Sequence, residues 1–241
     1  MAPKLPYNGA VLILSLDTSS PSGSIAVLRD KALIGVISTR DEENYSSRMF
    51  RHLEFLLNDL ELALGQFDLF AVSAGPGSFT GLRVGLTAAK GWAEVYKKPV
   101  VGVSALEAVA VQSRVTALIV VPVLDARRGQ VYFGFYRQTN EGLVLDGDEF
   151  VVTPEEFAAK LRVEARSFTM TLVTPDAELI PALAPYFDPG LAASEPASRV
   201  LAPFIGNIGY ERLLRGKVSD ALTLDANYVR RTDAQMRWKD G

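Results

Sequence analysis

The chain has 241 residues, a formal net charge of −3 and no cysteine. This length allows one large domain or two smaller ones, and the slightly acidic balance gives no electrostatic footprint for direct binding of nucleic acid. The lack of cysteine excludes disulfide bonds and cysteine zinc sites, and the longest apolar run, residues 117–124, is far shorter than the roughly 20 residues of a membrane span. We see no signal peptide before Asp17 and expect a cytoplasmic location.

Apolar spacing predicts strands and helices that alternate along the chain. We expect strands at residues 13–17, 24–28, 33–39, 67–74, 100–103, 116–124, 130–137, 143–152 and 169–173. We expect helices at residues 47–64, 80–96, 104–111, 179–187 and 204–215, and a further helix that starts at Thr153. This alternation is typical of an α/β fold.

Residue types at the ends of several predicted helices support these boundaries. Gly65 suits the position just after the helix that begins at residue 47. Ser104 with Glu107, and Thr153 with Glu156, have the spacing of capping boxes at the start of two later helices.

The most informative segment is the sequence Gly-Pro-Gly-Ser-Phe-Thr-Gly-Leu-Arg-Val-Gly at residues 75–85. It joins a predicted strand to a predicted helix, so backbone N–H groups at the helix start converge and can hold an anion or a carbonyl oxygen. Ser78 or Thr80 can cap this helix. The alternative is a tight turn in which the glycines allow unusual φ angles and close packing. The spacing fits neither a Walker loop nor a dinucleotide-binding fingerprint.

Two aspartates stand at the ends of predicted strands. Asp17 lies in Leu-Ser-Leu-Asp-Thr-Ser at residues 14–19, and Asp125 lies in Pro-Val-Leu-Asp-Ala-Arg-Arg-Gly-Gln-Val-Tyr at residues 122–132. Each aspartate is followed by a turn and a second strand. The order of elements around Asp17 therefore recurs around Asp125, although no repeat is visible in the sequence itself.

These three segments, in this order, resemble the TsaB (YeaZ) family of bacterial tRNA threonylcarbamoyladenosine biosynthesis. A shorter similarity at residues 227–230 extends the resemblance over nearly the whole chain. TsaB is similar to the glycoprotease-like (peptidase M22-like) enzyme TsaD, and both belong to the actin, sugar-kinase and Hsp70 (ASKHA) superfamily. The resemblance implies a two-lobed, actin-like α/β fold with ribonuclease-H-like lobes. We place an N-terminal lobe at 8–110, a C-terminal lobe at 111–225 whose final helix can return to the first lobe, and a tail at 226–241.

In that superfamily, the two aspartate turns face phosphate in the cleft between the lobes. The resemblance therefore implies a cofactor-binding role for Asp17, Thr18, Gly75, Gly77, Ser78 and Asp125. The alternative is that both aspartates cap their own turns through side-chain hydrogen bonds. For an adenosine-binding glycine pair the candidates are Gly206 and Gly209, which we interpret instead as small residues at helix contacts.

TsaD-like enzymes carry two metal-binding histidines four residues apart, on one helical face. At the positions where the resemblance places them, this chain has Ala105 and Val109, which cannot ligate a metal. The chain has one histidine, His52, which we interpret as a surface or boundary residue, and no nucleophile with a histidine base can be assembled. We expect no catalytic residue, no metal site and no cofactor of the chain's own. The resemblance leaves ATP or ADP and a metal to the partner or to a shared interface.

The predicted helix 80–96 is apolar on two sides, which suits a helix that is covered twice. Its small residues Gly81, Gly85 and Ala89 are four apart and allow another backbone to come close. TsaB-like proteins use first-lobe helices both in homodimers and in the heterodimer with TsaD. We therefore predict a partner interface formed by Leu82, Leu86, Ala89, Trp92 and Ala93, together with Phe50 and Leu57. The alternative is that this helix is buried entirely within its own lobe.

The resemblance implies a non-catalytic scaffold subunit that binds and activates TsaD, with TsaE as a third protein. It also implies a homodimer when the chain is alone, contact with tRNA only through the complex, and no membrane. The alternative is an ATP-dependent small-molecule kinase of the same superfamily, with Asp17 in phosphoryl transfer. The chain departs from the family at residues 44–47, where many TsaB-like chains have a His-Ser pair. We interpret Arg127 and Arg128 as a solvated loop rather than a phosphate contact.

Overall fold

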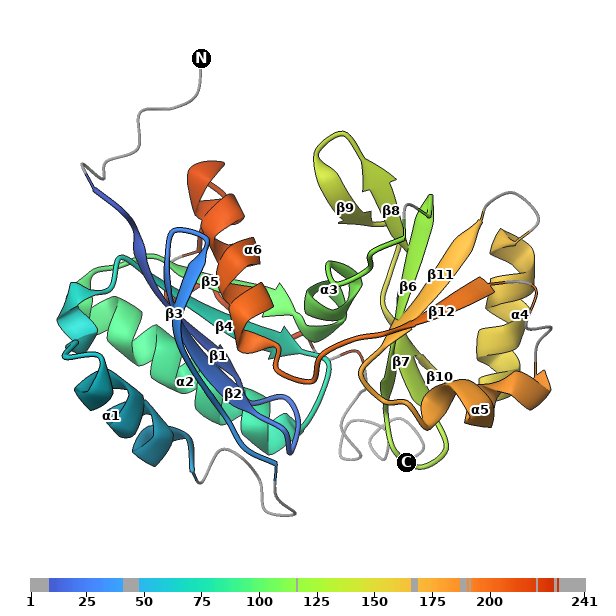
Figure 1. Ribbon diagram of the computed structural model, residues 1–241, viewed down its shortest axis with the longest axis horizontal. Helices are drawn as coiled ribbons and strands as arrows, with labels where there is room; N and C mark the ends of the chain where they lie inside the picture. Colours follow the sequence, from blue (N-terminus) through green and yellow to red (C-terminus); the bar gives the residue numbers. More distant parts are fainter. Residues whose placement is uncertain are drawn as a thin grey trace, which may run out of the picture. The chain divides into compact units, whose positions relative to one another are not determined.

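The segment that ends in Asp17 forms the central strand of a five-stranded sheet in the computed structural model of this chain. The structure describes residues 9–40, 48–115, 117–165, 169–186, 190, 192–219, 221–227 and 229. They form two compact units (Figure 1). The first unit joins the chain up to Ala108 to the segment Arg199–Ala226, and the second contains Val109–Ser198 and the described residues after Ala226. The segment Arg199–Ala226, which contains the last helix, is part of the first unit, an arrangement that the predicted lobe division allowed.

The sheet of the first unit has the strand order β3-β2-β1-β4-β5. Its strands are β1 (Leu12–Asp17), β2 (Ser24–Arg29), β3 (Ala32–Ser38), β4 (Leu69–Gly75) and β5 (Val100–Ser104). The first three strands pair antiparallel, whereas β4 and β5 run parallel to β1. Every residue of β1 and β4 is buried, so the polar residues Ser15, Asp17 and Ser73 lie in the interior together with the apolar residues of these strands.

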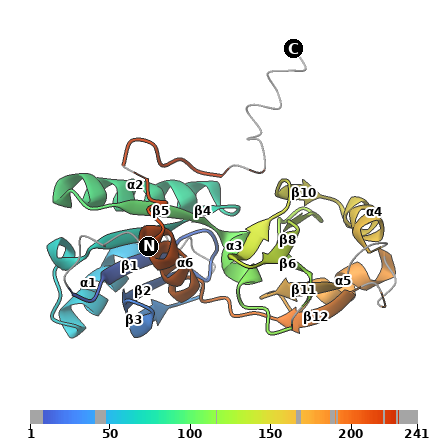
Figure 2. The ribbon, with the colours of Figure 1, turned by 90° about the horizontal axis from the view of Figure 1, so that it is seen from above.

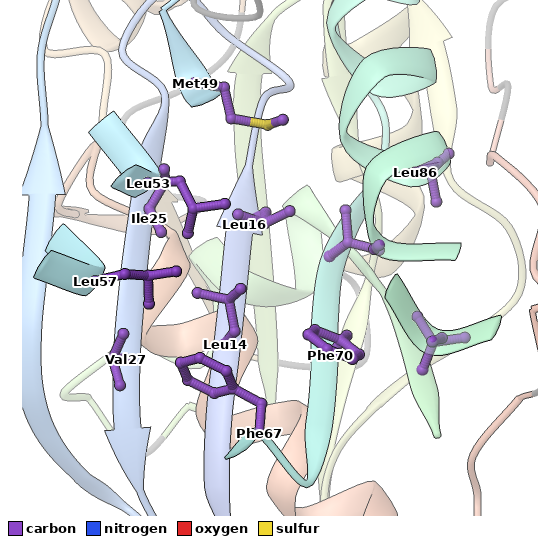
Figure 3. Packing of buried hydrophobic residues seen from close by; sticks show 14 of the residues in the cluster. Leu14, Leu16, Ile25, Val27, Met49, Leu53, Leu57, Phe67, Phe70 and Leu86 are labelled. Atoms are coloured by element: carbon purple, nitrogen blue, oxygen red, sulfur yellow. The ribbon is translucent and has the colours of Figure 1, made fainter. Parts of the chain in front are cut away.

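Helices cover both faces of this sheet. On one face lie α1 (Met49–Asp59) and α2 (Phe79–Tyr96), and Figure 3 shows Met49 and Leu53 of α1 next to Leu16 and Ile25 of the strands. Residue Ser15 points to the opposite face, because successive strand residues alternate. There α6 (Ala202–Leu214) packs on the sheet, and the Ser15 hydroxyl donates to the Ala202 carbonyl at 2.7 Å.

Two glycines let α6 lie close to the sheet. A Cβ atom at Gly206 would clash with the side chain of Leu28, and one at Gly209 would lie 2.9 Å from the Cβ of Ala71. This contact confirms the interpretation of both glycines as small residues at a helix contact.

The helix starts agree with the capping predictions. The Ser78 side chain accepts from the Gly81 N–H at 3.3 Å and caps α2. Ser104 accepts from two N–H groups in the first turn of α3 (Ala105–Ala110). Thr153 and Glu156 form the predicted capping box of α4 (Pro154–Glu164).

The second unit has a sheet with the order β10-β7-β6-β11-β12. Its strands are β6 (Ile119–Asp125), β7 (Val131–Phe133), β10 (Phe150–Val152), β11 (Met170–Thr174) and β12 (Ala192–Pro196). A hairpin of β8 (Tyr136–Thr139) and β9 (Gly142–Leu145) pairs with the start of β6. The core of this unit is centred on Phe133, whose ring contacts those of Phe135, Phe150 and Phe157.

The two sheets share one topology. In each, a central strand pairs antiparallel with the next strand, that strand pairs antiparallel with an edge strand, and two later strands run parallel to the centre. Strands β1 to β5 thus correspond to β6, β7, β10, β11 and β12. This repeat confirms the predicted two-lobed α/β class with ribonuclease-H-like lobes, and it aligns the end of β1 at Asp17 with the end of β6 at Asp125.

Two predicted strands are each divided in the structure. The segment 130–137 forms β7 and β8, because Pro122 of β6 has no N–H to donate and the ladder is interrupted opposite it, at Gly134. The segment 143–152 forms β9 and β10, with a turn at Gly147, whose φ is +85°.

Other boundaries also differ. The helix predicted at 47–64 ends at Asp59, Glu61 has a φ of +54°, and Gly65 lies in a short 3-10 turn, η2 (Leu64–Gln66). The helix predicted at 179–187 is α5 (Leu179–Leu183) followed by a 3-10 turn, η3 (Ala184–Tyr186). The departure at 44–47 and most of the tail 226–241 lie outside the described residues, as do two of the four residues in the similarity at 227–230.

Candidate functional site

The Asp17 carboxyl group caps the turn that follows β1. Its Oδ1 atom accepts hydrogen bonds from the Ser19 backbone N–H at 2.9 Å and from the Ser19 hydroxyl at 2.6 Å. The side chain is fully buried. The structure therefore contains the turn-capping interaction that the sequence left open as an alternative to a cofactor-binding role.

The second carboxyl oxygen of Asp17 lies in an unusual setting. Among the described residues, Asp17 Oδ2 is buried with no hydrogen-bond partner, and so is the hydroxyl of Ser73. These residues follow the register pair Leu16–Val72 of parallel strands β1 and β4, so their side chains share one face of the sheet. Burial raises the pKa of Asp17, while the side-chain and backbone hydrogen bonds from Ser19 act to lower it. A carboxyl group in such a place favours its neutral form or an additional polar partner.

The glycine-rich loop packs directly against the Asp17 turn. The Ser78 N–H donates to the Ser19 carbonyl at 2.7 Å, and the Thr18 hydroxyl donates to the Gly81 carbonyl at 2.7 Å. A Cβ atom at Gly77 would clash with Ser19, and one at Gly81 would clash with the Thr18 carbonyl. Close packing of backbone on backbone therefore explains these two glycines.

The small residues Gly81 and Gly85 on α2 are likewise explained by close packing against the Thr18 turn. A Cβ atom at Gly85 would clash with the Thr18 hydroxyl, one turn beyond the contact at Gly81. The predicted close approach of another backbone is found at Gly81, where it is the Thr18 carbonyl of the same chain, whereas Gly85 meets the Thr18 side chain. The contacts bring Asp17, Thr18, Gly77 and Ser78 together, and their cofactor-binding role stays a prediction, as does that of Gly75.

Asp125 caps its turn in the second unit. Its Oδ1 atom accepts from the Arg127 N–H at 2.7 Å, and its own N–H donates to Asp176 Oδ2 at 3.4 Å. Arg127, Arg128 and Gly129 have φ values of +59°, +55° and +71°, which build the turn between β6 and β7. Asp125 is exposed, unlike Asp17. A role for Asp125 in cofactor binding likewise stays a prediction.

The positions compared with metal-binding histidines lie on α3. Ala105 and Val109 are both fully buried in the apolar interior. In the part of the chain that the structure describes, no group of three His, Cys, Asp or Glu residues is placed to hold a metal ion. His52 lies on α1, where burial, followed by the charges of Arg48 and Arg51, lowers its pKa.

Five of the seven residues predicted for a partner interface are buried within the first unit, and the interface itself stays a prediction. Leu82, Leu86, Ala89 and Ala93 form the buried side of α2, and Leu57 is buried under α1. They face their own sheet because the longest apolar stripe of each helix supplies the core of the unit.

Two of the predicted interface residues are at least partly exposed to solvent. Phe50 is 55% exposed on α1, and Trp92 is half-buried beside the ring of Phe70, at 5.8 Å between centroids. The predicted interface did not include Phe55 and Val95, which are 64% and 72% exposed. The signal for both was an apolar residue placed outside the main helical stripe, next to charged residues.

Comparison with known proteins defines the class. Residues 25–177 match the family model described as TsaD, tRNA N6-adenosine threonylcarbamoyltransferase. The chain belongs to this family.

Several similar curated proteins are named TsaB. The chain is 40% identical over 128 residues to the tRNA threonylcarbamoyladenosine biosynthesis protein TsaB of Bacillus subtilis, with 53% of this chain and 56% of that protein covered. It is 30% identical over 136 residues to TsaB of Escherichia coli, with 54% and 57% covered. The chain thus spans a little over half the length of these curated relatives. These matches support the TsaB/YeaZ assignment made from the motifs.

A solved structure agrees with the fold. YeaZ from Pseudomonas aeruginosa superposes with a TM-score of 0.73 at 24% identity, over 90% of this chain and 99% of that one. In the described ranges, all helices are too short or too polar to cross a membrane.

Proposed function

We propose that this chain is a non-catalytic subunit of bacterial tRNA threonylcarbamoyladenosine synthesis that binds and activates a TsaD-type transferase. Relatives named for that biosynthesis, and a family model named for the transferase, support this proposal. TsaE is the third member of the proposed assembly, and the chain forms a homodimer when TsaD is absent. The net charge of −3 favours tRNA contact through the partner rather than through this chain.

The observation that carries the proposal is the outward side of α1 and α2, which we call the α1/α2 surface. It contains the exposed Phe50, Phe55 and Val95 and the half-buried Trp92. Both helices cover the same face of the sheet, so their outward sides belong to one layer of the unit. Large apolar side chains that stay exposed on such a layer are typical of protein interfaces, where aromatic residues are enriched.

The residue inventory supports a scaffold rather than an enzyme. Buried Ala105 and Val109 replace the metal-binding pair of TsaD-like enzymes. The Asp17 carboxylate, which a kinase would need for phosphoryl transfer, is fully buried and bonded to Ser19. The kinase alternative is therefore not favoured.

The test is size-exclusion chromatography with light scattering on the chain alone and mixed with TsaD from the same organism. We expect a concentration-dependent homodimer that converts to a heterodimer. Phe55→Glu should weaken the heterodimer at least about tenfold, because a charge would be buried in an apolar contact. Val163→Glu, at a 63% exposed site on α4 of the second unit, is the matched control.

The absence of a complex, even with TsaE and ATP, would contradict the proposal. ATP binding by the isolated chain, with phosphoryl transfer that is lost in Asp17→Asn, would favour the kinase instead.

A further inference from the structure

The segment that follows α6 lies beside α2 and closes one edge of the first sheet. We call its described residues, Lys217–Ser219 and Ala221–Ala226, the C-terminal strap. Figure 2 shows the strap running along α2. Two contacts fix this position: the Lys90 ammonium group of α2 donates to the Leu224 carbonyl at 2.8 Å, and Ser219 pairs with Val100 at the start of β5.

Both ends of the strap are anchored. The Val100 and Ser219 backbones exchange two hydrogen bonds, of 3.2 and 3.0 Å. Leu224 is 6% exposed and fills the space above Gly102, where a Cβ atom would lie 2.6 Å from it. Ala221 is also buried, and both apolar residues belong to the same core cluster as α1 and α2.

One apolar side chain between these anchors and one just before them are exposed. Leu222 is 87% exposed, and Val218, next to the bridge at Ser219, is 38% exposed. Because Ala221 and Leu224 hold the backbone on either side, the Leu222 side chain is displayed with little backbone freedom left to lose on binding. A side chain that is ordered in advance adds more affinity than one on a mobile tail.

The strap is continuous with the α1/α2 surface. α1 lies over β2 and β3, and the strap pairs with β5 at the other edge, so α1, α2 and the strap succeed one another across the sheet. At the end of α2 that leads into β5, Val95 and Tyr96 are 72% and 37% exposed. The exposed apolar side chains therefore extend past the helix and onto the strap.

The size of a stable interface also points beyond the two helices. Six residues of α1 and eight of α2 are exposed. A specific interface of standard size uses about 20–30 residues on each side. A partner that packs across α1 and α2 must therefore meet a neighbouring element, and the strap is the neighbour on the α2 flank.

We propose that the C-terminal strap is the third element of the partner surface, and that Leu222 inserts into an apolar pocket of the TsaD-type partner. This inference rests on the proposed function. In the heterodimer the strap extends the partner-binding surface beyond α2. Ala221 and Leu224 hold it on its own unit.

The experiment measures the affinity of the full-length chain for TsaD by titration calorimetry, with three variants. Leu222→Glu should weaken binding at least about tenfold, Val95→Glu should weaken it similarly, and Val163→Glu should stay within about twofold of the unsubstituted chain. Thermal unfolding monitored by circular dichroism should be unchanged in all three variants, since the sites are exposed.

The outcomes separate the two proposals. Unchanged affinity in Leu222→Glu with weakened binding in Val95→Glu would overturn the role of the strap and leave the α1/α2 surface in place. Unchanged affinity in both would overturn the α1/α2 surface and, with it, the strap. No binding by the unsubstituted chain would overturn the proposed function itself and everything built on it.

Discussion

Asp17 shows how one buried carboxyl group can make stability depend on pH. Its pKa in the folded chain is raised by burial, whereas the unfolded chain has the ordinary value of about 3.9. The unfolded state therefore releases this proton at lower pH than the folded state. As a result, Asp17 lowers the free energy of unfolding as the pH rises from the unfolded pKa towards the raised folded pKa.

The variant Asp17→Asn tests this linkage. Asparagine keeps an oxygen for the two Ser19 donors and places an amide at the Oδ2 position, which is without a partner among the described residues. Between pH 4 and pH 7, the free energy of unfolding of the parent chain should fall relative to that of Asp17→Asn, because only the parent has a carboxyl group at this position to ionise. Urea unfolding at both pH values measures it. A difference that does not change with pH would mean that Asp17 titrates normally in the folded chain.

A substitution at Gly81 tests whether close packing on Thr18 requires glycine in the glycine-rich loop. In Gly81→Ala the new methyl group would clash with the Thr18 carbonyl, which is backbone and cannot turn away. We expect a loss of about 2 kcal/mol or more in the free energy of unfolding.

Gly91→Ala is the matched control on the same helix. No atom lies within 4 Å of a Cβ atom at Gly91, so alanine should raise stability by up to about 1 kcal/mol through helix propensity. Urea unfolding of both variants gives the comparison. Equal effects at the two glycines would show that packing on Thr18 does not decide the residue at position 81.

At the scale of elements, the sequence predicted what depends on local chemistry. The caps at Ser104 and Thr153 were predictable because a short side chain bonds to the backbone two or three residues away. The division between β7 and β8 was not, because Pro122 acts on Gly134 across a ladder that exists only in the folded sheet. Strand β12 was missed because an exposed edge strand lacks the apolar pattern of a buried one.

The candidate site shows the same limit. The sequence identified the Asp17 turn and the glycine-rich loop, since both are continuous motifs. It did not show that they pack on each other, and it assigned the core stripe of α2 to a partner. Periodicity alone does not tell which apolar side of a helix faces its own sheet. Phe55 and Val95 became visible as surface residues once that side was fixed.

The C-terminal strap is an element that the sequence did not predict, and Leu224 tests its attachment. Leu224→Ala removes most of a buried side chain from the space above Gly102, so we expect a loss of about 2–3 kcal/mol in the free energy of unfolding. Leu222→Ala, two residues earlier and 87% exposed, should change it by less than about 0.5 kcal/mol. Urea unfolding that shows no loss for Leu224→Ala would indicate that the strap is not part of the folded unit.

At the scale of the whole molecule, the two units have the same topology but different dependence on the rest of the chain. The second unit has its own aromatic core within Val109–Ser198. The first unit takes α6 and the strap from Arg199–Ala226, so its N-terminal part is incomplete alone. Without α6, the sheet face that carries Ser15, Leu28 and Ala71 would be exposed to water.

This asymmetry predicts how fragments behave. The fragment 109–198 should unfold cooperatively in urea, because a continuous segment supplies its whole core. The fragment 1–108 should not, since burying the second face of its sheet requires α6. Joining 199–226 to 1–108 through a flexible Gly/Ser linker should restore cooperative unfolding. Cooperative unfolding of 1–108 alone would show that α6 is an addition to a self-sufficient lobe, and that each lobe folds from its own continuous segment.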